Sequence, residues 1–188
     1  MSPKEQLEQL THGTATVLSE KELLTKLERG NPLRAKLGVD PTAPDIHLGH
    51  TVVLEKLRQF QVLGHQAVLI IGDFTATVGD PTGRSSTRPP LTREEVLANA
   101  ETYTEQAFKI LDRELTEVVY NGDWFCKMSY EEVLKLNARV TMQQMLQRED
   151  FKTRLEGAKE VRLHEIQYPI MQGWDSVEVR SDVELGGT

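Results

Sequence analysis

Two histidines three residues apart give the clearest chemical signal in the sequence. His47 and His50 follow a predicted short strand and stand in the first turn of a predicted helix, so their side chains share one face. The N–H groups of a helix N-terminus attract phosphate, and Gly49 between the histidines lets a bulky ligand approach the backbone. Two imidazoles there could stabilise charge that builds up on a nucleotide α-phosphate under attack. Two surface histidines would give the same short motif, and a zinc site lacks a recognisable third ligand.

A polar stripe is predicted near the end of the chain. Tyr168, Gln172 and Asp175 are spaced i, i+4 and i+7, which places them on one side of a helix. Apolar neighbours such as Ile170 and Met171 surround them, and a buried polar side chain needs a hydrogen-bonding partner. The pattern predicts a binding face, with a solvated helix face as the alternative.

These residues need a scaffold, and the sequence predicts one in which strands and helices alternate. Apolar runs at 33–39, 67–71 and 116–120 predict strands, the later two typical of a buried parallel sheet. Helix-capping patterns begin at Ser19, Thr92 and Ser129, and Asp45 is the predicted cap of a helix that ends near Gly64. This order predicts an α/β domain around a parallel sheet flanked by helices.

Two segments stand outside the alternation. Residues 1–32 are predicted as an N-terminal helical lead-in and residues 33–188 as the main domain. Residues 137–164 carry no strand signal and mix Met142, Met145 and Leu146 with many charges, which predicts an inserted helical segment. These three side chains could contact another subunit or simply pack on their own domain.

Composition excludes several classes of protein. The single cysteine, Cys126, cannot form an internal disulfide, and the sequence shows neither a signal-peptide pattern nor an apolar run of membrane-spanning length. We therefore do not expect a secreted, disulfide-rich or membrane-spanning protein, and we expect a cytoplasmic location. Lys and Arg total 22 against 29 Asp and Glu, a net charge of −7, which argues against a non-specific nucleic-acid coat.

Four longer motifs follow one another along the chain. They are G-V-D-P-T-A-P-D-I-H-L-G-H at 38–50, I-G-D-F-T-A-T-V-G-D-P-T-G-R at 71–84, Y-P-I-M-Q-G-W-D-S at 168–176 and V-E-L-G-G-T at 183–188. In this order and at these spacings, the chain resembles the bacterial tyrosyl-tRNA synthetase family. The resemblance implies a Rossmann-like class I catalytic domain over residues 33–188, with an insertion at about 137–164 and no resident metal.

The resemblance also implies a two-step reaction. Tyrosine would be activated by ATP, which carries Mg²⁺, to tyrosyl-adenylate, and the tyrosyl group would then pass to tRNA(Tyr). A homodimer with contacts at 137–164 is implied as well. His47 and His50 would stabilise the transition state, and Asp175 would accept a hydrogen bond from the substrate phenol. The implied ATP site comprises Gly38, Asp40, Thr42, His47, Gly49, His50 and Gly187, and the implied tyrosine site comprises Asp80, Tyr168, Gln172 and Asp175.

Some positions depart from the family pattern or carry little signal alone. Lys36 stands where one branch of the family has a tyrosine that touches the phenol, so we leave Lys36 out of the site. Arg84 takes a place often held by lysine. Arg84 and Arg88 could contact phosphate or tRNA, or lie in a solvated loop. Asp80 alone would be interpreted as a turn residue before Pro81.

The sequence stops at Gly-Gly-Thr, where family members continue with further ligand-binding residues, a Lys-Met-Ser-Lys-Ser-like loop and an anticodon-reading domain. We therefore expect a fragment with little adenylation activity alone. Two alternatives remain open. One is a tryptophan-specific relative or another H-x-G-H nucleotidyltransferase; the other is a truncated, non-catalytic paralogue that acts as a binding module.

Overall fold

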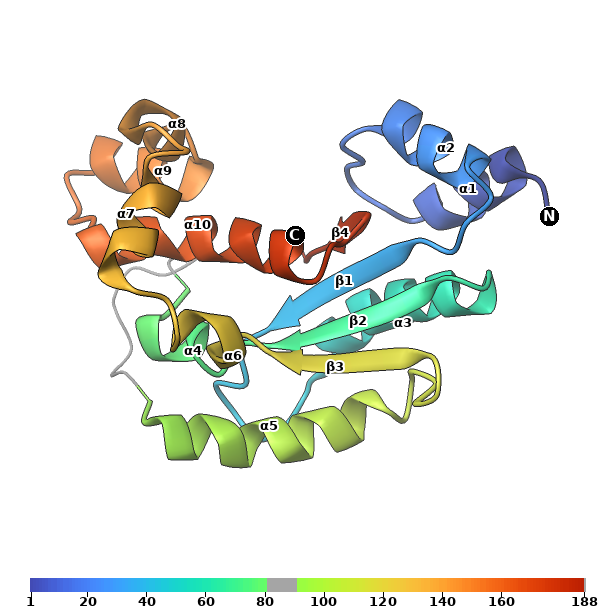
Figure 1. The fold of residues 1–188 in the computed structure, drawn as a ribbon, viewed down its shortest axis with the longest axis horizontal. Coiled ribbons are helices and arrows are strands. Elements are labelled where there is room, and N and C mark those ends of the chain that lie inside the picture. The colour runs from blue at the N-terminus through green and yellow to red at the C-terminus, as the bar shows by residue number, and fades with distance from the viewer. Residues whose placement is uncertain (81–90, 188) are drawn as a thin grey trace.

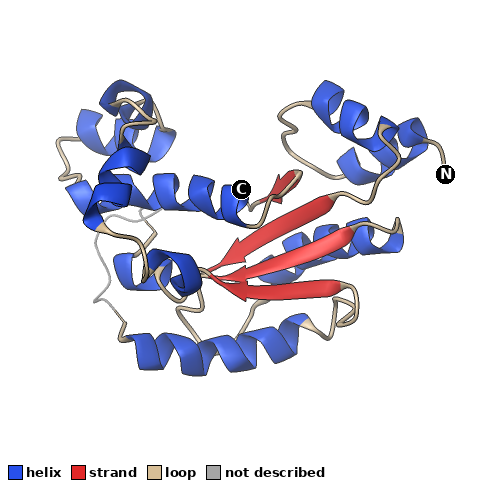
Figure 2. Ribbon diagram, viewed as in Figure 1, coloured by secondary structure: helices blue, strands red, loops and turns tan. Residues whose placement is uncertain are grey.

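A four-stranded parallel sheet forms the centre of the molecule (Figures 1 and 2). The computed structural model describes residues 1–80 and 91–187. The strands are β1 (Arg34–Val39), β2 (Gln66–Ile71), β3 (Thr116–Tyr120) and β4 (Val183–Leu185), in the order β3-β2-β1-β4 with every adjacent pair parallel. The predicted α/β fold around a parallel sheet is confirmed.

Helices cover both faces of this sheet (Figure 1). Ala67 and Leu69 of β2 face an apolar core shared with α3 and α5, whereas Val68 and Ile70 pack with Val179 at the end of α10. Alternate residues of each strand therefore face opposite layers. The helices in the described part of the chain are α1 (Pro3–Thr11), α2 (Glu20–Glu28), α3 (Leu48–Val62), α4 (Thr75–Val78), α5 (Arg93–Ala107), α6 (Gly122–Phe125), α7 (Tyr130–Asn137), α8 (Met142–Leu146), α9 (Glu149–Glu156) and α10 (Leu163–Glu178).

Several helices begin where their capping patterns predict. Thr92 and Ser129 form capping boxes with Glu95 and Glu132 at the starts of α5 and α7, and Ser19 caps α2 through its hydroxyl. A helix start of this kind depends on a few adjacent residues, which is why the sequence alone locates it.

The predicted cap of α3 is wrong. The helix begins at Leu48 and its N-cap is His47, not Asp45. The Nδ1 atom of His47 accepts a hydrogen bond from the Gly49 N–H at 3.1 Å, so the helix is capped by an imidazole and not by the expected carboxylate. Asp45 instead accepts a hydrogen bond from Gln106 of α5.

The buried character predicted for residues 116–120 is also wrong in part. Each residue of β3 is only half-buried, because β3 lies at the edge of the sheet and, among the described residues, pairs only with β2. The apolar composition of a strand does not reveal whether it has one neighbour or two.

The N-terminal helices share the main apolar core. Leu10 of α1 and Leu27 of α2 are buried in the same cluster as Ala35 and Leu37 of β1. Residues 1–32 thus contain two helices, whose apolar side chains pack on the sheet. The division of the chain at residue 33 stays a prediction.

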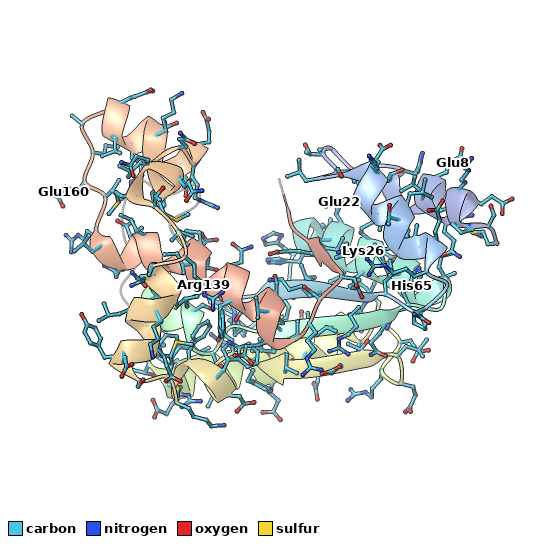
Figure 3. The ribbon with its side chains drawn as sticks, turned by 45° about the horizontal axis from the view of Figure 1, so that its top comes forward. Glu8, Glu22, Lys26, His65, Arg139 and Glu160 are labelled. Atoms are coloured by element: carbon cyan, nitrogen blue, oxygen red, sulfur yellow. The ribbon has the colours of Figure 1, made fainter. Side chains whose placement is uncertain are left out.

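Polar contacts also join the N-terminal helices to the sheet. The Nδ1 atom of His65 accepts the Leu33 N–H, and its Nε2 lies 3.1 Å from the side-chain oxygen of Gln6 in α1. Lys26 of α2 donates to the carbonyl of Asp182, just before β4. Figure 3 shows Lys26 and His65 between the N-terminal helices and the sheet.

Residues 137–164 form the predicted helical segment. The short helices α8 and α9 come between α7 and α10 in the chain and lie together at one end of the molecule (Figure 1). Phe151 of α9 is fully buried, and Arg154 pairs with Glu165 in the first turn of α10 at 2.7 Å. These contacts fasten the segment to the helix that carries the polar stripe.

Candidate active site

Polar residues follow three neighbouring strands where those strands end. Asp40 follows β1, Asp73 comes two residues after β2, and Asn121 follows β3. In open parallel α/β sheets, ligands bind outside this edge where the strand order reverses. Here β1 lies between β2 and β4, so the order reverses between β1 and β4. The fold therefore places a binding site next to Asp40.

The carboxylate of Asp40 joins segments that are far apart in the sequence. Its Oδ1 accepts the Thr75 hydroxyl at 2.7 Å, and its Oδ2 accepts the Tyr168 hydroxyl at 2.9 Å. Gly72 makes this arrangement possible, because a Cβ there would collide with the Asp40 carboxylate and the Thr75 hydroxyl. Two predicted site residues, Asp40 and Tyr168, are thereby brought into direct contact.

The Tyr168 hydroxyl is held in its protonated form. Burial of the phenol raises its pKa, and the charges of Asp40, Asp80 and Asp175 raise it further. Tyr168 is therefore a neutral hydrogen-bond donor at neutral pH. Asp80, whose charge acts on the phenol in this way, is half-buried.

Asp175 is a buried carboxylate at the far end of the same stripe. Only 5% of the residue is exposed. Its Oδ1 accepts the Trp124 indole N–H at 3.0 Å, and its Oδ2 accepts the Asn121 amide at 3.3 Å. Burial raises the pKa of Asp175 to about 7, although the Asn121 hydrogen bond, the Lys36 charge and the Trp124 hydrogen bond each lower it. Asp175 can thus gain or lose a proton near neutral pH.

Gln172 completes the stripe between Tyr168 and Asp175. It is exposed, and its amide donates to Glu184 of β4 at 2.9 Å. A uniformly solvated helix face is therefore wrong for this stripe, since Asp175 is buried. Lys36, left out of the predicted site, also contacts this group: its Nζ donates to the Gln172 carbonyl at 2.9 Å.

The two histidines stack on one another at the start of α3. Their ring centroids are 3.9 Å apart with an interplanar angle of 27°. The Nδ1 atom of His47 accepts the Gly49 N–H, and the Nδ1 atom of His50 accepts the His47 N–H. These bonds assign the proton of each neutral ring to Nε2, which leaves two N–H donors. Burial and the neighbouring His47 lower the pKa of His50, which favours its neutral form.

The glycines of the predicted ATP site play different structural parts. A Cβ on Gly49 would lie 2.9 Å from the His47 ring, so Gly49 is needed by the histidine itself. Gly38 and Gly187 are both exposed, and a Cβ on either would meet no atom within 4 Å. Each leaves open space near the carboxyl ends of β1 and β4. Thr42 lies in the turn after β1, where its N–H bonds the Asp40 carbonyl.

Sequence reasoning missed several residues that shape the site. Thr75 orients Asp40, whereas Asn121 and Trp124 hold Asp175. The place of Asn121 directly after a predicted strand is the one signal that could have found it. Arg84 and Arg88 lie outside the described residues.

Two features are absent from residues 1–80 and 91–187. None of the helices there is both long and apolar enough to cross a membrane. No group of three or more His, Cys, Asp or Glu side chains in this part of the chain is arranged to hold a metal ion.

Comparisons with known proteins identify related sequences. The chain is 57% identical over 187 residues to a tyrosine–tRNA ligase of Francisella tularensis, covering 100% of this chain and 47% of that protein. It is 54% identical over 189 residues to the tyrosine–tRNA ligase of Carboxydothermus hydrogenoformans, covering 98% and 46% respectively. The chain thus spans about half the length of the curated relatives it matches.

Solved structures show the same fold. A C-terminally truncated mitochondrial tyrosyl-tRNA synthetase of Aspergillus nidulans superposes with a TM-score of 0.80 and 27% identity, covering 95% of this chain and 54% of that one. A family model described as class I tRNA synthetases (W and Y) matches residues 28–188. The chain therefore belongs to the class I tRNA synthetase family of the tryptophan and tyrosine type.

Proposed function

We propose that this chain provides the tyrosine- and ATP-binding part of a tyrosine–tRNA ligase. The observation that carries the proposal is Asp175, a buried carboxylate held by two donors at the carboxyl edge of the sheet. Burial makes the charged form of Asp175 unfavourable, and a hydrogen bond donated by a substrate phenol would offset part of that cost. Fold and family agree with the proposal, since the curated relatives carry that name.

Selectivity for tyrosine follows from the same carboxylate. Phenylalanine would leave Asp175 desolvated and without its phenol donor, which is the general logic for which tyrosyl-tRNA synthetases are the standard example. The ammonium group of tyrosine would lie near Asp80, Tyr168 and Gln172. The negative charges of Asp40 and Asp80 around Tyr168 favour a cation at this end of the stripe.

The chemistry proposed for this site is adenylation of tyrosine. A carboxylate oxygen of tyrosine attacks the α-phosphorus of ATP, and the bond to pyrophosphate breaks. Hydrogen-bond donors that are in place before the reaction stabilise the charge on the phosphorus oxygens. His47 and His50 present two Nε2–H donors at the N-terminus of α3, where the helix dipole favours an anion.

The rest of the proposed ATP site lies around the turn after β1. Asp40, Thr42 and Gly49 stand in or beside that turn, and the open space at Gly38 and Gly187 would receive the nucleotide. Mg²⁺ would arrive bound to the ATP phosphates as part of the substrate.

We also propose that the ligase transfers the tyrosyl group to tRNA(Tyr). It would act in the cytoplasm as a homodimer. The dimer proposal has support from the helical segment, where Met142 is 49% exposed and Met145 and Leu146 are half-buried. Sedimentation of a Met145→Glu variant tests it. A monomer is the expected result, and an unchanged dimer would remove residues 137–164 from the interface.

Calorimetric titration with tyrosine, phenylalanine and tryptophan tests the function. Tyrosine is expected to bind, phenylalanine to bind more weakly, and Asp175→Ala to weaken tyrosine binding by roughly 10- to 100-fold. The control is Glu178→Ala, an exposed carboxylate on the same helix, which should bind tyrosine normally. A preference for tryptophan would assign the site to the other branch of the family and overturn the proposal.

A further inference from the structure

A buried lysine lies beside the proposed tyrosine site. The Lys36 side chain is 1% exposed. Within residues 1–80 and 91–187 no other lysine is buried. Lysine rarely occupies such a position unless it is paired, because removing an ammonium group from water is costly. Such a placement requires compensation by specific partners.

Those partners come from two other elements. The Lys36 ammonium donates to the Gln172 carbonyl of α10 at 2.9 Å and lies 3.2 Å from the Glu184 carboxylate of β4. The same Glu184 oxygen accepts the Gln172 side-chain amide at 2.9 Å. Lys36 therefore links β1, β4 and α10 around one proposed substrate-binding side chain.

The second oxygen of Glu184 is also engaged, since it accepts the Ser176 hydroxyl at 3.2 Å. Ser176 follows directly after Asp175 in α10. The group formed by Lys36, Glu184, Gln172 and Ser176 thus brackets the part of α10 that carries Asp175.

We propose that Lys36 is a positioning residue of the tyrosine site, which fixes Gln172 through Glu184 and supplies the positive charge that balances buried Asp175. This inference rests on the proposed function for its substrate, but its electrostatic part concerns the protein alone. The site would then hold a carboxylate ready to accept the phenol without needing a charged partner from the substrate.

The electrostatics support the geometry. The positive charge of Lys36 lowers the pKa of Asp175, whereas burial raises it. Asp40, after β1, raises it as well, and the neutral donors Asn121 and Trp124 lower it. Tyr168, on α10, stays a neutral phenol over this range. Among the described residues, Lys36 is therefore the cation that acts on Asp175.

The indole of Trp124 provides a direct readout of this charge. Its Nε1–H donates to Asp175 Oδ1, so its ¹H–¹⁵N resonance should shift as Asp175 titrates. The sequence has two tryptophans, and Trp174 Nε1 has no hydrogen-bond partner in the described part of the chain. A Trp174→Phe variant assigns the two resonances.

The expected results differ in sign between two variants. Lys36→Met should move the Trp124 midpoint upward by roughly one pH unit, because the cation is removed. Glu184→Gln should move the midpoint downward, because the negative charge that offsets Lys36 is removed while Asp175 keeps its cation. Lys36→Met is expected to fold, since Met is close in length to the lysine side chain and Glu184, with 38% of its side chain exposed, can be hydrated.

Tyrosine binding gives the second readout. At pH 7, Lys36→Met should raise the tyrosine Kd about fivefold, because a smaller fraction of Asp175 is ionised in the variant. At pH 9 Asp175 is ionised in both proteins, so this contribution to the difference in Kd should disappear. Lys26→Met is the matched control, because Lys26 also donates to a backbone carbonyl beside β4 but lies under the N-terminal helices (Figure 3).

The outcomes are distinguishable. An unchanged Trp124 midpoint in Lys36→Met, or the same upward shift in Lys26→Met, would overturn the role of Lys36. Failure of the unmodified chain to bind tyrosine would contradict the proposed function, while the indole titration would still decide whether Lys36 balances Asp175.

Discussion

At the residue scale, the site is governed by what burial does to individual charges. Asp175 and Lys36 are both buried, and each depends on named partners in other elements. Asp40 is similarly bound to Thr75 and Tyr168. The polar side chains of the stripe are therefore an organised network, in which a change of charge at one position alters the protonation of its neighbour.

The raised pKa of Asp175 predicts a pH-dependent stability. The folded value is about 7, above the ordinary 3.8, so the folded state binds a proton more tightly than the unfolded state. The stabilisation is complete below pH 4 and is lost as the pH rises towards 7 and slightly above. The Asp175→Asn variant should lack this loss, which is on the order of a few kcal/mol, so the unfolding free energy of the wild type relative to the variant should fall as the pH rises. Urea unfolding at pH 5 and pH 8 measures it; Glu178→Gln is the control, and an identical pH dependence in Asp175→Asn would contradict the prediction.

At the element scale, helix starts and strand ends place the functional groups. The N-terminus of α3 follows β1 by a short turn, and its cap is the His47 side chain itself. The carboxyl ends of β1, β2 and β3 deliver Asp40, Asp73 and Asn121 to one edge. Helix α10 lies beside the carboxyl ends of the strands and brings its stripe to the same edge (Figure 1).

The cap of α3 predicts a specific effect of Gly49→Ala. The added Cβ would lie 2.9 Å from the His47 ring, so the ring must move and the cap weakens. We expect a loss of about 1 kcal/mol in unfolding free energy and a weaker affinity for ATP. Gly173→Ala in α10 is the matched control, because a Cβ there meets no atom within 4 Å and Ala should stabilise a helix interior by roughly 0.5–1 kcal/mol. Equal effects of the two substitutions would exclude this explanation.

At the scale of the whole molecule, the N-terminal helices and the sheet share one core. Leu10, Leu27 and Leu37 belong to the same buried cluster. The contacts of His65 with Gln6 and of Lys26 with Asp182 reinforce that attachment. Residues 1–32 should therefore unfold together with the sheet.

This shared core predicts that Leu10→Ala destabilises the entire chain. Deleting a fully buried leucine side chain costs about 2–5 kcal/mol through lost burial and a residual cavity. Thermal unfolding followed by circular dichroism should show a single transition at a lower temperature. Leu18→Ala is the control, because Leu18 is 94% exposed. A separate early transition, with the main one unmoved, would indicate an independent N-terminal unit.

Much of the fold and part of the site could be predicted before the structure. The alternation of strands and helices, the caps at Thr92 and Ser129, the stripe at 168–175 and the histidine pair depend on short-range periodicity and on neighbouring residues. Such local patterns can be recognised in the sequence because each one depends on only a few neighbouring residues.

Only the tertiary structure decided which groups meet. Asn121 reaches Asp175 from 54 positions away, Tyr168 reaches Asp40 from 128, and Lys36 reaches Gln172 from 136. Two further features could be seen only in the structure: β3 lies at the edge of the sheet, and the N-cap of α3 is His47 and not Asp45. Such contacts depend on how layers pack and which strand ends lie side by side. Those are properties of the assembled sheet, and no short stretch of sequence contains them.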